Sequence, residues 1–222
     1  MLCWTWKRPI KLKSTTNPWN ACKPSEQPWI LSGKKLVIDL VDLAQARRDS
    51  NWQRRGFLDK VFLPDEQQRI RTASDPDRMV WTLWSMKESV YKQHPAAGRA
   101  FVPLHIHCFE LDRDSGLGRV SYQQSCLYTQ TQHTHPYILT LASTVPVFDR
   151  ARVLGLSESS YASQHAALRQ AIRSEAALRY GDGAFVKDTD GAPYWQQTTT
   201  GLNIPLGISH HGHYGAFVLP TV

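Results

Sequence analysis

Two groups of charged residues have the types and spacing that bind a metal ion or a phosphate. Asp39 and Asp42 stand in the apolar run 36–43, where a carboxylate must be paired, hydrated or bound to a cation. They predict either an acid that caps the next turn or a ligand for a hard cation such as Mg²⁺. Glu88 and Lys92 are four residues apart, so they share one face of a helix. They predict either a surface ion pair or a metal-binding carboxylate beside an ammonium group that binds phosphate.

Histidines form a third candidate group. His105 and His107 would share one face of a strand, and three more histidines follow Ser209 within residues 210–213. Such clusters are typical of zinc sites, but no cysteine or carboxylate completes a recognised zinc spacing. The favoured interpretation is therefore surface or hydrogen-bonded histidines. The step from Ser209 to His210 differs, because it ends a predicted strand at a turn, where donors can meet an anion.

The elements that must position these residues are helices and strands in an α+β arrangement. Apolar spacing predicts helices that begin at Pro64 and Pro76, and a later helix that Gly181 or Gly183 ends. Tyr161, His165, Leu168, Ile172 and Ala176 form the expected buried stripe of that later helix. Strands are expected at 36–41, 105–111, 120–128, 137–142, 203–209 and 214–219, with a polar loop ahead of residue 203.

Composition limits the class of protein. The chain has 222 residues, of which 41% are hydrophobic and 20% charged, and it has no apolar run of 18 residues or more. Four widely spaced cysteines fit a reduced, cytoplasmic thiol set. Residues 1–35 carry seven Lys or Arg and one acid, whereas the rest carries 19 basic and 18 acidic residues. The net charge of +7 therefore comes from a basic arm and does not indicate a DNA-binding surface over the whole protein.

At four places the sequence resembles the 4′-phosphopantetheinyl transferase, or holo-acyl-carrier-protein synthase, superfamily. The family pattern has an aspartate in a strand, Phe and Glu ahead of a helix, a Trp-x-x-Lys-Glu-Ala/Ser-x-x-Lys helix, and a Ser-His step. The matching segments here are Ile38-Asp39-Leu40-Val41-Asp42, Phe62-Leu63-Pro64-Asp65-Glu66, Trp84-Ser85-Met86-Lys87-Glu88-Ser89-Val90-Tyr91-Lys92 and Ile208-Ser209-His210-His211.

The resemblance implies a fold of two similar halves, each with helices packed on a small antiparallel sheet. The expected units are a Trp- and Pro-rich arm at 1–32, a half at 33–150 with the carboxylates, and a half at 151–222 with the Ser-His step. It also implies transfer of the 4′-phosphopantetheine arm of coenzyme A to a serine of an acyl or peptidyl carrier protein, releasing 3′,5′-ADP. Fatty acid or polyketide biosynthesis in the cytoplasm is the implied setting.

The resemblance further implies the roles of individual residues. Asp39 and Glu88 would bind Mg²⁺, with Asp42 as a further ligand. Phosphates of coenzyme A would be bound by Lys87, Lys92, Arg173, Ser209 and His210, the last two at the 3′-phosphate. Glu88, Lys87 or a metal-bound water would act as the general base.

Three positions differ from the family pattern. The family has Gly at the position of Val37, often Glu at the position of Val41, and Lys at the position of Ala192. These differences keep open a second hypothesis, a weakened member that binds coenzyme A or a carrier protein without transfer. A third hypothesis is a nucleic-acid-binding protein that uses the basic arm, for which binding would depend strongly on salt.

Overall fold

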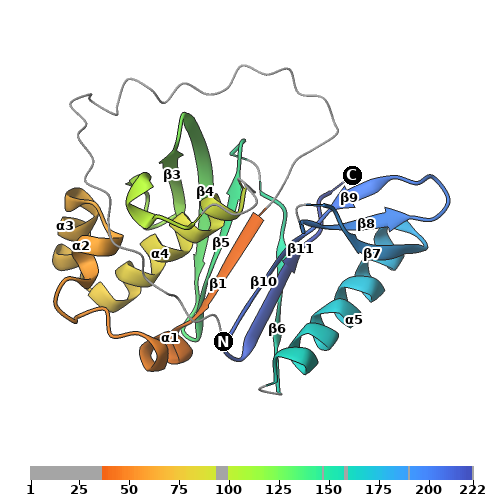
Figure 1. Cartoon of the computed structure of the whole chain (residues 1–222), viewed down its shortest axis with the longest axis horizontal. Helices are drawn as coiled ribbons and strands as arrows, with labels where there is room; N and C mark the ends of the chain where they lie inside the picture. The colour runs from red at the N-terminus through yellow and green to blue at the C-terminus, as the bar shows by residue number, and fades with distance from the viewer. Residues whose placement is uncertain (1–36, 94–99, 147, 158–159, 190, 222) are drawn as a thin grey trace.

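The computed structural model describes residues 37–93, 100–146, 148–157, 160–189 and 191–221, and Figure 1 shows their arrangement. The predicted arm at 1–32 lies outside the described residues. The described part combines helices with antiparallel sheets, which confirms the predicted α+β class. None of the helices in these ranges is long and apolar enough to cross a membrane.

A five-stranded antiparallel sheet organises the first part of the chain. Its strands lie in the order β1-β5-β4-β3-β2, so the first strand of the chain pairs with the last one of this sheet. Asp39 lies opposite Thr140 in the β1–β5 register. The strands are β1 (Val37–Asp42), β2 (Ile106–Leu111), β3 (Leu117–Tyr122), β4 (Ser125–His133) and β5 (Tyr137–Ser143).

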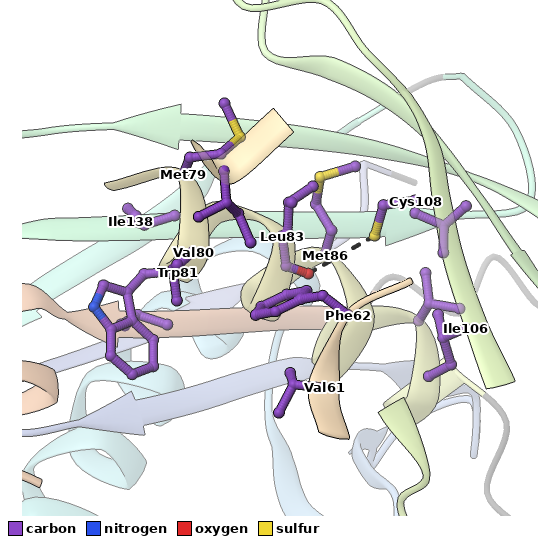
Figure 2. Packing of buried hydrophobic residues seen from close by; sticks show 14 of the residues in the cluster. Val61, Phe62, Met79, Val80, Trp81, Leu83, Met86, Ile106, Cys108 and Ile138 are labelled. Atoms are coloured by element: carbon purple, nitrogen blue, oxygen red, sulfur yellow. Dashed lines mark hydrogen bonds between the residues drawn. The ribbon is translucent and has the colours of Figure 1, made fainter. Parts of the chain in front are cut away.

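Helix α4 (Pro76–Gln93) covers one face of this sheet. The backbone N–H of Arg78 donates to the Asp75 carboxylate, so Asp75 caps the start of this helix. Its buried residues recur at helical spacing, and Figure 2 shows them packed against Phe62 and against Ile106 and Cys108 of β2. Three shorter helices precede α4: α1 (Leu43–Asp49), α2 (Phe57–Val61) and α3 (Pro64–Thr72); a 3₁₀ turn, η2 (Pro103–His105), follows it.

The second part of the chain has one helix and two small sheets. Helix α5 (Tyr161–Tyr180) ends at Gly181, as predicted, and buries Leu168, Ile172 and Ala176. The first sheet has the order β10-β11-β6 and the second the order β7-β8-β9. The strands are β6 (Ala151–Gly155), β7 (Gly183–Lys187), β8 (Pro193–Gln197), β9 (Asn203–Pro205), β10 (Gly207–His211) and β11 (Tyr214–Val218).

The two parts pack through the sheet face opposite α4. Ile38 and Leu40 on β1 join Ala216 and Val218 on β11 in one buried cluster, whereas Val41 belongs to the cluster under α4. In Figure 1, β10 runs beside β1. The outer edge of β1 is therefore covered by the second part of the chain.

Several predicted elements need correction. The expected strand at 120–128 is two strands, because the chain reverses after Tyr122 through Gln123, whose φ is +57°. No glycine marked this turn. The expected polar loop ahead of residue 203 contains β7 and β8, and β6 was not predicted. Tyr161 is not buried at the start of α5 but 64% exposed.

Candidate active site

Asp39, Glu88 and Lys92 lie together where α4 ends over β1. The Lys92 ammonium Nζ is 2.7 Å from Asp39 Oδ1 and 3.9 Å from Glu88 Oε1. The helical spacing places Glu88 and Lys92 on one face of α4, and strand alternation turns Asp39 toward that face. Two elements that are far apart in sequence thus bring two carboxylates to one ammonium group.

Each of these carboxylates has one buried oxygen that no described residue contacts by a hydrogen bond. Asp39 Oδ2 and Glu88 Oε2 are buried, and neither has a hydrogen-bond partner in the described part of the chain. An unsatisfied buried oxygen costs free energy, so this pair is suited to receive a cation. Carboxylate oxygens are the ligands that Mg²⁺ prefers, and Mg²⁺ commonly takes one or two carboxylates together with substrate phosphates. The residues present therefore fit a magnesium ion.

Each charge of this group shifts the pKa of its neighbours. Burial raises the pKa of Glu88 to about 7; Lys92 opposes this rise and the negative charge of Asp39 adds to it. For Lys92, burial acts to lower the pKa, but the charges of Asp39 and Glu88 outweigh it and raise the pKa. Lys92 is therefore a permanent cation at neutral pH, whereas Glu88 exchanges its proton near pH 7.

Asp42 is placed differently from the predicted metal ligand. Its Oδ1 accepts hydrogen bonds from the backbone N–H groups of Ala44 and Gln45, which caps α1. Its Oδ2 accepts from the backbone N–H of His213 at 2.9 Å. Burial acts to raise the pKa of Asp42, but the three backbone hydrogen bonds outweigh it and lower the pKa. Both oxygens of Asp42 thus accept hydrogen bonds from the protein backbone. This is the capping role that the sequence left open as an alternative to metal binding.

Lys87 also lies away from the predicted site. Its side chain is fully buried, and its Nζ is 2.7 Å from the carboxylate of Glu66. The same Nζ donates to the backbone carbonyls of Pro103 and Ile106 at 3.0 and 2.6 Å. The three protons of the ammonium group are therefore all engaged, and Lys87 joins α4 to α3 and β2 instead of facing a phosphate.

Strand β10 brings the Ser-His step beside β1. The backbone N–H of Leu40, next to Asp39, donates to Ser209 Oγ at 3.1 Å. The backbone N–H of Asp42 donates to His211 Nδ1 at 2.9 Å. These bonds satisfy the outer edge of β1 with side chains of β10.

The ring of His210 is influenced by the charge of Lys92. Burial lowers the pKa of His210, and the positive charges of His165, Lys92 and His211 lower it further. Lys92 therefore lies close enough to influence the imidazole. An anion placed among these groups would meet several positive or donating groups at once.

Helix α5 brings two aromatic rings to His210. Tyr161 and His165 were expected in the core, but their rings lie against His210. Arg173 is exposed two turns further along the same face of α5, about 12 Å from His165 by helical rise. In the described residues no contact joins Arg173 to the carboxylate group. Arg169 lies one turn from His165, and its guanidinium stacks 5.5 Å from the Phe185 ring centroid.

Part of the chain matches a known family. Residues 36–142 match the family model of the 4′-phosphopantetheinyl transferase superfamily. This segment contains Asp39, Glu88 and Lys92 and does not include β10. No curated protein and no solved structure gave a significant match. The match covers slightly less than half of the chain and agrees with the superfamily that the sequence motifs resemble.

Proposed function

We propose that this protein transfers the 4′-phosphopantetheine arm of coenzyme A to a serine of an acyl or peptidyl carrier protein in a Mg²⁺-dependent reaction. The superfamily supports phosphopantetheine transfer in general. The observation that carries the finer proposal is a pair of buried oxygens beside Lys92, Asp39 Oδ2 and Glu88 Oε2, for which the described part of the chain supplies no hydrogen-bond partner. We also propose that the reaction takes place in the cytoplasm, where it would supply modified carrier proteins for fatty acid or polyketide biosynthesis.

The residues divide the work of binding the pyrophosphate of coenzyme A. Asp39 and Glu88 would hold Mg²⁺, which supplies positive charge to the pyrophosphate as charge develops on the leaving group. Lys92 is positioned to bind a phosphate oxygen once the carboxylates bind the ion. Ser209 and His210, on the neighbouring strand, are assigned to the 3′-phosphate.

The reaction exchanges one P–O bond for another. The serine oxygen of the carrier attacks the phosphorus that bears the pantetheine arm, and the bond from this phosphorus to the bridging oxygen breaks. The leaving group is 3′,5′-ADP. The serine proton must pass to a base, and of the two protein candidates only Glu88 lies beside the site, because Lys87 is fully buried against Glu66. Burial raises the pKa of Glu88 to about 7 without the ion, and bound Mg²⁺ would lower this pKa, so Glu88 would meet the serine as an ionised carboxylate.

Mass spectrometry of an apo carrier protein tests the proposal. After incubation with the protein, coenzyme A and Mg²⁺, the carrier should gain one phosphopantetheine, and the gain should disappear when EDTA replaces Mg²⁺. A carrier whose serine is replaced by alanine is the control. Binding of coenzyme A without any mass gain, over several acyl and peptidyl carriers, would identify a non-catalytic member instead.

A further inference from the structure

Three aromatic rings from two elements meet at one end of the β10 strand. His165 lies 4.3 Å from Tyr161 and 4.9 Å from His210, measured between ring centroids, and Tyr161 lies 5.4 Å from His210. Tyr161 and His165 are one turn apart in α5, which brings both rings to the same face of the helix. The two imidazoles are thus neighbours although 45 residues separate them.

The Nε2 atom of His165 is buried and has no hydrogen-bond partner among the described residues. A buried ring nitrogen without a hydrogen-bond partner lowers the stability of the folded protein. Its presence therefore needs an explanation, such as a bound group that supplies the missing partner. Tyr161, which covers one side of the ring, is largely exposed, so this nitrogen lies beneath the surface and not in the core. The cluster therefore contains a buried ring nitrogen whose hydrogen bonding is unused among the described residues, next to a largely exposed tyrosine.

The surroundings of the two imidazoles carry positive charge. Burial lowers the pKa of His165, and the positive charges of Arg169 and Lys187 lower it further. Lys92 and His211 act in the same way on His210. No carboxylate of the described residues lies within ion-pair distance of either ring. A group with negative charge would relieve this repulsion and accept hydrogen bonds from both imidazoles.

We propose that His165 binds, together with His210, the 3′-phosphate of coenzyme A. This proposal rests on the proposed function, which assigns that phosphate to His210, and it adds a residue of α5 to the site. A phosphate monoester has three terminal oxygens, enough to accept from two imidazoles that lie edge to face. His165 would contribute to binding and would not touch the reacting bond.

Isothermal titration calorimetry with two nucleotides isolates this contact. The parent protein should bind 3′,5′-ADP more tightly than 5′-AMP, because only the former carries the 3′-phosphate. His165→Ala should weaken binding of 3′,5′-ADP by roughly tenfold to a hundredfold, the range for a hydrogen bond to a charged group, and leave 5′-AMP binding unchanged. His165→Gln, which retains a side-chain donor, should recover part of the loss.

A matched control is His135→Ala, since His135 is an exposed histidine between β4 and β5. Thermal unfolding of each variant verifies that it is folded. If both nucleotides lose affinity equally in His165→Ala, or if neither does, His165 does not bind the phosphate. If the parent binds neither nucleotide, the coenzyme A site of the proposed function fails, whereas a parent that binds them and an unaltered variant overturn the role of His165 alone.

Discussion

Glu88 is the residue on which the two interpretations of the sequence differ most. A surface ion pair with Lys92 would be worth less than about 1 kcal/mol. The structure places Glu88 instead in a mostly buried position, with a second carboxylate nearby and with one oxygen that has no partner among the described residues. A group that stabilises charge in the transition state contributes roughly 3–4 kcal/mol, so the two roles differ greatly in their effect on rate.

We therefore expect Glu88→Gln to fold normally and to lose transfer activity by about a hundredfold or more. Asp39→Asn should behave alike, and the double variant should be far less than additive, because both carboxylates serve one ion. Initial rates measured against Mg²⁺ concentration check this. Glu110→Gln, which removes a largely exposed carboxylate paired with Arg119, is the control and should keep the parental rate. Near-parental rates for a folded Glu88→Gln would return Glu88 to the surface-pair interpretation.

The raised pKa of Glu88 also predicts a pH dependence of stability without divalent ions. Because this pKa is about 7 in the folded protein and near 4.5 in the unfolded chain, the folded state binds the proton more tightly. The contribution of the group to stability is complete below about pH 4.5 and is lost as the pH rises through 7. Relative to the parent, Glu88→Gln should therefore gain up to about 3 kcal/mol in unfolding free energy between pH 5 and pH 8.

Urea unfolding in EDTA at the two pH values measures this gain. Adding Mg²⁺ at pH 8 should stabilise the parent and not Glu88→Gln, since the ion binds the folded protein through the ionised carboxylate. If the difference in unfolding free energy between Glu88→Gln and the parent is the same at pH 5 and pH 8, Glu88 titrates in its ordinary range.

At the scale of elements, α4 turns the side chains of the adjacent residues Lys87 and Glu88 in different directions. Lys87 turns inward to Glu66, whose oxygens also accept from the backbone N–H groups of Leu63 and Cys108. Glu88 turns toward β1. The buried ion pair between Lys87 and Glu66 fixes the positions of α3, α4 and β2. The face of α4 toward β1 carries the candidate site. Neighbouring residues of one motif thus serve packing and chemistry separately.

Lys87→Met should cost about 3–5 kcal/mol in unfolding free energy, because it leaves the Glu66 carboxylate buried without its cation. The double variant Glu66→Gln with Lys87→Met should recover much of this loss. Chemical denaturation measures the stability of both. In the folded double variant the KM for coenzyme A should remain within about twofold of the parental value. A tenfold higher KM in that variant would place Lys87 in contact with coenzyme A after all.

At the scale of the whole molecule, the junction between β1 and β10 assembles the site. Ser209 and His211 bind the N–H groups of Leu40 and Asp42, and Asp42 in turn accepts from His213. The hydrogen bonds of Asp42 therefore serve two purposes, the cap of α1 and the attachment of the β10–β11 turn. Gly212 in that turn lies so close to Asp42 that an added Cβ would be 2.3 Å from Oδ2.

Substitution of Asp42 separates this role from metal binding. Asp42→Ala removes the cap and the acceptor for His213 and should cost roughly 2–3 kcal/mol in unfolding free energy. Asp42→Asn keeps an oxygen for the cap and should cost about 1 kcal/mol or less. Both variants should need the parental Mg²⁺ concentration for half-maximal transfer, as titration of the ion would reveal. A folded Asp42→Asn that needs much more Mg²⁺ would restore Asp42 to the metal site.

Local sequence was sufficient for the elements that carry the site. The strand around Asp39, the capped helix that contains Glu88 and Lys92, and the end of α5 at Gly181 were predicted because periodicity, caps and glycine act over a few residues. The same reasoning failed at the β3–β4 turn, because Gln123 adopts a positive φ without the glycine that usually marks it.

The partners of each charged side chain were decided only by tertiary structure. The spacing of Glu88 and Lys92 fits a surface pair and a metal site equally, and only the position of β1 beneath α4 separates these roles. Asp42 could cap a helix or bind a metal until the His213 backbone occupied its second oxygen. His165 looked like part of an apolar stripe, yet it lies against His210 because α5 packs on the β10–β11 sheet. Sequence periodicity determines which residues share a face, whereas contacts between distant segments determine what that face meets.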